Sequence, residues 1–185
     1  MTCALIVYAN GSEDMEVTAI TDILNRGGIK VTKAALNDDG GLKVTLAHGT
    51  TVVCDKNLND CADDYAVIAI PGGLVGAENC RDSTTLIAKL QEQKAKDGYI
   101  AAICAAPGFV LATHGLVGNA RATGYPGCAD NIENYVDKGV VVDKENKLIT
   151  GQGPAFCMEF ALAILEELKG KAVADEVRSG MLLTK

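Results

Sequence analysis

Three short stretches of the sequence contain residues that could do covalent chemistry on a small electrophile. In the first, Gly98–Ala112, a continuous apolar run ends at Cys104, and small residues with Pro107 follow. Such a run is typical of a strand buried on both faces, and the residues after it are typical of a helix start. The spacing predicts a nucleophile elbow whose helix dipole and free N–H groups favour the Cys104 thiolate. The alternative is a core cysteine, since cysteine is among the most buried residue types.

The second stretch is the start of a predicted helix that carries Glu16. Glu16 shares a helix face with Ile20 and Ile23, so its carboxyl group is expected to point inward, whereas Glu13 and Asp14 are expected to face water. A buried carboxylate without a cationic partner has a raised pKa. A protonated Glu16 could donate a hydrogen bond to a thiolate and act as general acid or base. The alternative is a carboxylate held by backbone donors of the first helical turn.

The third stretch is Pro71-Gly72-Gly73, directly after a second apolar strand. Paired glycines permit positive φ and leave backbone N–H groups exposed. One of these N–H groups, together with that of Ala105, would form an oxyanion hole. Taken alone, the glycine pair is equally compatible with an ordinary tight turn.

The elements that position these stretches alternate between strands and helices. This order predicts an α/β fold with a mainly parallel sheet, in which sites form at the carboxyl ends of the strands. The three stretches each follow a predicted strand and are therefore expected at one edge of the sheet. The predicted strands are Cys3–Ala9, Ile29–Leu36, Leu42–Ala47, Thr51–Cys54, Ala66–Ile70, Tyr99–Ile103, and a hairpin of Val140–Val142 with Lys147–Thr150; the predicted helices are a first helix capped by Ser12 and ending near Arg26, then Ser83–Lys96, Pro154–Lys169 and Ala172–Met181.

Composition narrows the class of protein. The 185 residues, 48% apolar and 22% charged, suit a single domain over residues 1–185. A net charge of −7 argues against sequence-independent binding to nucleic acid or to an anionic membrane. No apolar run is long enough to span a bilayer, and the N-terminus has no basic signal-peptide region, so a cytoplasmic location is expected.

Cysteine and histidine usage gives no sign of a disulfide framework or a metal site. The seven cysteines are odd in number and contain no Cys-x-x-Cys pair. The two histidines, His48 and His114, have no zinc-type spacing. We expect reduced thiols that mostly pack in the interior, and no metal.

Several motifs resemble the ThiJ/PfpI superfamily, and within it the parkinsonism-associated protein deglycase (DJ-one-like) branch. The similarity covers nearly the whole chain. The motifs are IAAICAAP around Cys104, IPGGLVGAE at 70–78, GSEDMEV with Glu16, GIKVT at 28–32, and LITGQGPAFCMEFALAILEELKGK near the C-terminus.

The resemblance implies a flavodoxin-like three-layer sandwich, as in class I glutamine amidotransferases, and a homodimer without a cofactor. It implies that Cys104 is an oxidation-prone nucleophile and that Glu16 is its protonated hydrogen-bond partner. Gly73 and Ala105 would be the oxyanion donors, with Gly72 lining the site. The implied substrates are small dicarbonyls such as methylglyoxal or glyoxal, or their adducts on proteins.

Two positions depart from the family pattern. Tyr125 stands before Pro126, where many members have histidine, and His48 stands where the deglycase branch commonly has arginine. Both are expected to line the site. The Tyr125 substitution removes the Cys–His pair that peptide hydrolysis would use. His114 is expected to be a structural or exposed residue.

These observations predict a cofactor-independent glyoxalase or deglycase that forms a hemithioacetal on Cys104. One alternative is an oxidative-stress sensor or chaperone, in which Cys104 is oxidised to sulfinic acid. A further alternative, disfavoured by Tyr125, is an amidohydrolase or protease.

Overall fold

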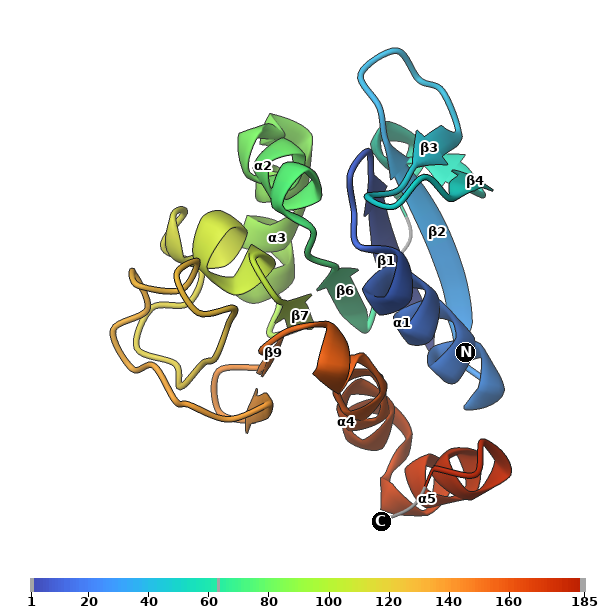
Figure 1. The fold of residues 1–185 in the computed structure, drawn as a ribbon, viewed down its shortest axis with the longest axis vertical. Helices are drawn as coiled ribbons and strands as arrows, with labels where there is room; N and C mark the ends of the chain where they lie inside the picture. The colour runs from blue at the N-terminus through green and yellow to red at the C-terminus, as the bar shows by residue number, and fades with distance from the viewer. Residues whose placement is uncertain (1, 63, 184–185) are drawn as a thin grey trace.

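A mainly parallel sheet is the middle layer of the structure, a computed structural model that describes residues 2–62 and 64–183 (Figure 1). In that part of the chain seven strands form the sheet in the order β5-β2-β1-β6-β7-β9-β8. Each neighbouring pair is parallel except β8 and β9, so the predicted α/β fold is confirmed. The strands are β1 (Cys3–Ala9), β2 (Lys30–Leu36), β5 (Lys56–Asn57), β6 (Val67–Ile70), β7 (Tyr99–Ile103), β8 (Val140–Asp143) and β9 (Leu148–Gly151).

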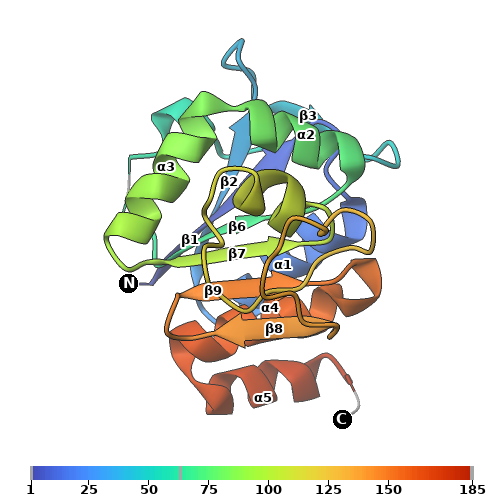
Figure 2. The same cartoon turned by 90° about the vertical axis from the view of Figure 1, so that its left-hand side faces the viewer.

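Helices cover both faces of this sheet (Figures 1 and 2). One face packs against α1 (Asp14–Arg26), α4 (Cys157–Lys169) and α5 (Lys171–Gly180). The other face packs against α2 (Leu74–Asp82), α3 (Thr84–Ala95) and a π-helical turn, Pro107–Ala112. Because side chains alternate across a strand, β1 sends residues into both cores, which explains why its sequence is apolar throughout.

The strand order creates one topological switch point, between β1 and β6. The chain leaves β1 for β2 on one side and later returns to β6 on the other side. In open α/β sheets, ligands bind outside the carboxyl ends of the strands at such a point. The segments that carry Glu16, Gly72 and Cys104 follow β1, β6 and β7, three adjacent strands, so the fold brings them to one edge.

Some local expectations were wrong. The N-cap of α1 is Glu13, while the Ser12 hydroxyl accepts a hydrogen bond from the Ala9 N–H at 3.1 Å. Helix α2 was missed because its sequence, LVGAENCRD, is short and has a glycine inside it. The segment Pro154–Phe156 is a 3₁₀ turn that precedes α4. The strands β3 (Lys43–Thr45) and β4 (Thr51–Val53) form a separate antiparallel hairpin, shorter than predicted.

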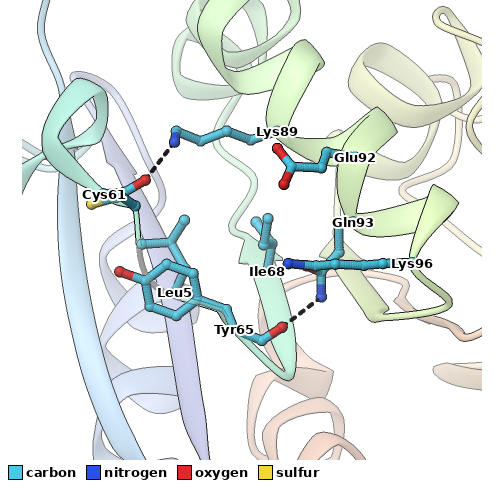
Figure 3. A pocket seen from close by; sticks show the side chains of 9 residues that line it. Leu5, Cys61, Tyr65, Ile68, Lys89, Glu92, Gln93 and Lys96 are labelled. Carbon is cyan, nitrogen blue, oxygen red and sulfur yellow. Dashed lines mark hydrogen bonds between the residues drawn. The ribbon is translucent and has the colours of Figure 1, made fainter.

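A small cavity of about 80 Å³ lies between α3 and the strands beneath it (Figure 3). Polar side chains of α3 bridge it to the chain opposite. The Lys89 ammonium donates to the carbonyl of Cys61 at 2.5 Å, and the buried Gln93 amide donates to the carbonyls of Tyr65 and Tyr99 at 3.0 and 3.1 Å. These bonds attach α3 to Cys61 and Tyr65, which precede β6, and to β7.

No helix in the described part of the chain is both long enough and apolar enough to cross a membrane.

The buried Gln93 amide gives a test of this attachment. The Gln93→Met variant keeps the side-chain length but removes the buried amide that donates to both carbonyls, so we expect it to lose about 1–3 kcal/mol of unfolding free energy. Gln91→Met on the exposed face of the same helix is the matched control and should change stability by less than about 0.5 kcal/mol. Urea unfolding of both variants measures the difference, and equal effects would contradict this role for Gln93.

Candidate active site

Cys104 lies at a sharp turn between β7 and the π-helical turn. Its φ is +64°, a left-handed conformation that is costly for a residue with a side chain and occurs mainly where function requires it. Two backbone hydrogen bonds hold the turn: the Cys104 N–H donates to Gly151 O at 2.9 Å, and the Tyr125 N–H donates to Cys104 O at 2.7 Å. This is the strand–turn–helix geometry that the sequence predicts, and the Cys104 side chain is 8% exposed.

Glu16 points inward from the first turn of α1 and is fully buried. Its Oε2 accepts a hydrogen bond from the Gly72 N–H at 2.7 Å. Its Oε1 is buried without a well-formed hydrogen bond, although the Cys104 thiol is near enough for each group to shift the pKa of the other. The inward orientation expected of Glu16 is confirmed.

Gly72 separates the Glu16 and Cys104 side chains and has no room for a side chain of its own. A Cβ on Gly72 would lie 2.5 Å from Cys104 Cβ, 3.0 Å from Cys104 Sγ and 2.8 Å from Glu16 Oε2. Contacts below 3.0 Å force atoms to shift. The glycine therefore permits the carboxyl group and the thiol to approach each other.

Glu13 is a further buried carboxylate, although the sequence predicted that it would face water. It is only 7% exposed, because its N–H donates to Gly72 O at 3.0 Å and its Oε2 accepts from the Glu16 N–H at 2.7 Å. The signal in the sequence was its position three residues before Glu16, which is the spacing of an N-cap and its N3 donor. Glu13 fixes the backbone of Glu16 and adds negative charge beside it.

Burial raises the pKa of Glu16 to about 7, as the inward orientation predicts. The Gly72 N–H acts in the opposite direction, and the negative charge of Glu13 adds to the increase. A pKa near neutrality suits a group that both accepts and returns a proton.

Burial also raises the pKa of the Cys104 thiol, to about 12, and the charge of Glu16 raises it further. The N–H groups of Gly73 and Ala105 lower it, but by less. The thiolate expected from the sequence therefore stays a prediction: burial and the charge of Glu16 oppose it, whereas the two N–H donors favour it. Glu16 and Cys104 are close enough for each to shift the pKa of the other, so a proton can pass between them.

The two N–H groups directed at the Cys104 sulfur come from Gly73 and Ala105, as the family resemblance implies. Gly73 has a φ of +81°, and a Cβ there would lie 2.3 Å from Gly11 O, so only glycine fits. Helix α2 begins at the next residue, Leu74, which leaves the Gly73 N–H free of helical partners. Preorganised N–H donors of this kind stabilise negative charge that develops beside them.

The remaining candidates occupy the rim or lie apart from the site. Tyr125 is 47% exposed and contacts Cys104 through its backbone. The His48 side chain is 75% exposed and lies 3.9 Å from Glu13 Oε1, so it reaches Glu16 only through Glu13. His114 is exposed and its Nε2 lies 2.8 Å from Arg81 O, as expected of a structural residue. Among the described residues, no three His, Cys, Asp or Glu side chains gather as metal ligands do.

Comparison with known proteins finds close relatives. Residues 2–167 match the DJ-1/PfpI family. The chain is 42% identical to Protein dj-1beta of Drosophila melanogaster over 97% of this chain and 96% of that protein. It is 32% identical to a Caenorhabditis elegans protein named glutathione-independent glyoxalase DJR-1.2, over 98% and 96% of the two chains. The solved structure of Toxoplasma gondii DJ-1, oxidized, superposes with a TM-score of 0.95 at 37% identity and covers both chains fully.

The raised pKa of Glu16 predicts how stability depends on pH. The folded protein holds the Glu16 proton up to about pH 7, whereas the unfolded chain releases it near the ordinary value of 4.5. The contribution of Glu16 to stability is therefore complete below pH 4.5 and is lost as the pH rises to about 7. Glu16→Gln removes this loss, so its stability relative to wild type should rise by roughly 3 kcal/mol between pH 4.5 and 8.

Urea unfolding at several pH values measures this difference. The matched control is Glu176→Gln on the exposed face of α5, where the carboxylate stays in water. A stability difference between Glu16→Gln and wild type that does not change with pH would mean that the buried carboxyl group titrates normally.

Proposed function

This chain belongs to the DJ-1/PfpI family, and from that premise we propose that it is a cofactor-independent glyoxalase that converts methylglyoxal or glyoxal through a hemithioacetal on Cys104. The observation that carries the proposal is the buried pair of Cys104 and Glu16, in which a carboxyl group with a pKa of about 7 adjoins a thiol. The name of the C. elegans relative supports a reaction that needs no glutathione.

In the first step the Cys104 sulfur attacks the aldehyde carbon of the dicarbonyl. The Glu16 carboxylate takes the thiol proton as the carbon–sulfur bond forms, so no free thiolate accumulates. The aldehyde oxygen becomes an oxyanion and receives hydrogen bonds from the N–H groups of Gly73 and Ala105. Transfer of the proton from Glu16 to this oxygen completes the hemithioacetal.

In the second step Glu16, again a carboxylate, removes the proton from the carbon attached to sulfur. The electron pair moves toward the neighbouring carbonyl and gives an enediolate. Glu16 returns the proton to the second carbon, and the hydroxyl proton of the first carbon moves to the oxygen of the second, which leaves a thioester of a 2-hydroxy acid. Water then attacks the thioester, the thiol leaves with a proton, and the net reaction is dicarbonyl plus water to 2-hydroxy acid.

The same steps on an aldehyde already attached to Arg, Lys or Cys of a protein would release that side chain, so the proposal extends to protein deglycation. It also includes the homodimer and the cytoplasmic location that the sequence led us to expect. Tyr125 offers no imidazole beside Cys104, which favours carbonyl chemistry over peptide hydrolysis.

A second candidate function, redox sensing, is favoured by Glu16 Oε1, which is buried near the Cys104 sulfur without a well-formed hydrogen bond. A protonated Glu16 could donate a hydrogen bond from this oxygen to a sulfinate on Cys104, and the two N–H donors would bind the same anion. Formation of the sulfinic acid consumes two molecules of peroxide and yields two of water.

The proposed mechanism predicts the behaviour of two variants. Cys104→Ser should lose methylglyoxal turnover to the background level, and Glu16→Gln should reduce kcat/KM by about 10²–10⁴-fold because the general base is missing. For the wild type, kcat/KM should rise with pH through about 7 as Glu16 ionises and then become constant. Lactate formation from methylglyoxal is the measurement.

Wild-type rates in either variant would remove this mechanism. If the protein shows no dicarbonyl turnover, mass spectrometry after mild peroxide treatment decides for the sensor. Selective gain of two oxygen atoms at Cys104, lost in Glu16→Gln, is the result that redox sensing requires.

A further inference from the structure

An uncharged cavity of about 450 Å³ lies beside the Cys104 turn. Its volume is in the range of small-molecule binding sites. Two of its lining residues are joined to Cys104 through the backbone. The Tyr125 N–H donates to Cys104 O, and Gln152 directly follows Gly151, whose carbonyl accepts from the Cys104 N–H. The lining residues are Tyr125, Pro126, Gln152, Gly153, Pro154, Ala155 and Phe156.

Two aromatic rings in this cavity are held in place by glycines. A Cβ on Gly153 would lie 3.3 Å from the Tyr125 ring, and a Cβ on Gly139 would lie 2.2 Å from the Phe156 ring. Each ring therefore packs directly against backbone on one side. Tyr125 and Phe156 nevertheless remain 47% and 36% exposed, so apolar ring surface is left for a ligand. Because these rings are already held in place, binding a ligand against them costs little side-chain entropy of the protein.

We propose that this cavity binds the substituent of the dicarbonyl and makes the enzyme prefer aryl-substituted α-oxoaldehydes over methylglyoxal. The inference rests on the proposed function and adds the class of substrate. An aromatic substituent gains both apolar burial and ring–ring contact with Tyr125 and Phe156. A charged substituent, such as a lysine or arginine side chain, finds no charged partner among the lining residues.

The reaction of an aryl substrate balances in the same way as that of methylglyoxal. Phenylglyoxal forms its hemithioacetal at the aldehyde carbon, the proton moves to the ketone carbon that carries the ring, and water releases mandelate. Only water is consumed, and no oxidant or reductant takes part. The ring stays attached to the second carbon throughout, so one pocket serves every step.

The test compares kcat/KM for phenylglyoxal and methylglyoxal, measured by formation of mandelate and lactate. We expect the wild type to prefer phenylglyoxal by about tenfold or more, given what an apolar pocket gains per added group. Phe156→Ala should lower the phenylglyoxal-to-methylglyoxal ratio by about tenfold, and Phe156→Tyr should keep it. Val53→Ala removes a 66%-exposed apolar side chain from the β4 hairpin and is the control that should keep the ratio.

A binding measurement separates this inference from the proposed function. By NMR, Cys104→Ser should bind mandelate about tenfold more tightly than lactate, and adding Phe156→Ala should remove the difference. If this binding difference is found but the wild type shows no turnover, the pocket is supported and the proposed glyoxalase activity is contradicted. An unchanged substrate ratio in Phe156→Ala, or equal binding of the two acids, would overturn the inference. The inference would also be overturned if Phe156→Ala lost a dimer and kept the phenylglyoxal-to-methylglyoxal ratio. The cavity would then be occupied by a second copy of the chain and not by the substrate.

Discussion

The burial of one carboxyl group, that of Glu16, is the constraint on which the rest of the site depends. Removal from water raises its pKa to about 7, and the charge of Glu13 adds to the increase. The same burial brings it to the Cys104 thiol, whose own pKa is raised. In the proposed mechanism, the proton of Cys104 passes to Glu16 when a carbonyl substrate is attacked. The burial that makes an ionised Glu16 costly for the fold would then also govern the reaction of Cys104.

The sheet makes this arrangement possible because three adjacent parallel strands end at the same edge. The strand ends contribute different components: the carboxyl group after β1, the Gly73 N–H after β6, and the thiol and the Ala105 N–H after β7. The close approach requires glycine at position 72, where any Cβ would collide with both Cys104 and Glu16. Positive φ at Gly73 and at Cys104 turns the donor and the nucleophile toward one another.

The long elements and the position of the site could be predicted from the sequence, because they depend on local patterns. Apolar runs at β1, β6 and β7 and the helical face of Glu16 are readable without knowledge of the fold. The protonation state of Cys104 could not be predicted in this way, because the dipole and the N–H donors that favour a thiolate are local, whereas the desolvation that opposes them comes from packing. Glu13 was wrongly predicted to face water for the same reason. Its N–H donates to the carbonyl of Gly72, which lies far away in the sequence. The aromatic cavity was missed because Tyr125 and Phe156 line the same cavity only in the folded chain.

The central claim of the proposed mechanism is that Cys104 enters the reaction as a thiol and that Glu16 accepts its proton. The most direct measurement is an NMR titration of protein labelled with ¹³C at the glutamate carboxyl and the cysteine Cβ positions, with Glu16→Gln and Cys104→Ser used for assignment. The account predicts a carboxyl transition of Glu16 near pH 7 and no thiol transition of Cys104 at that pH. A Cys104 resonance that reports thiolate at pH 7, or a Glu16 transition near the ordinary value of 4.5, would contradict it.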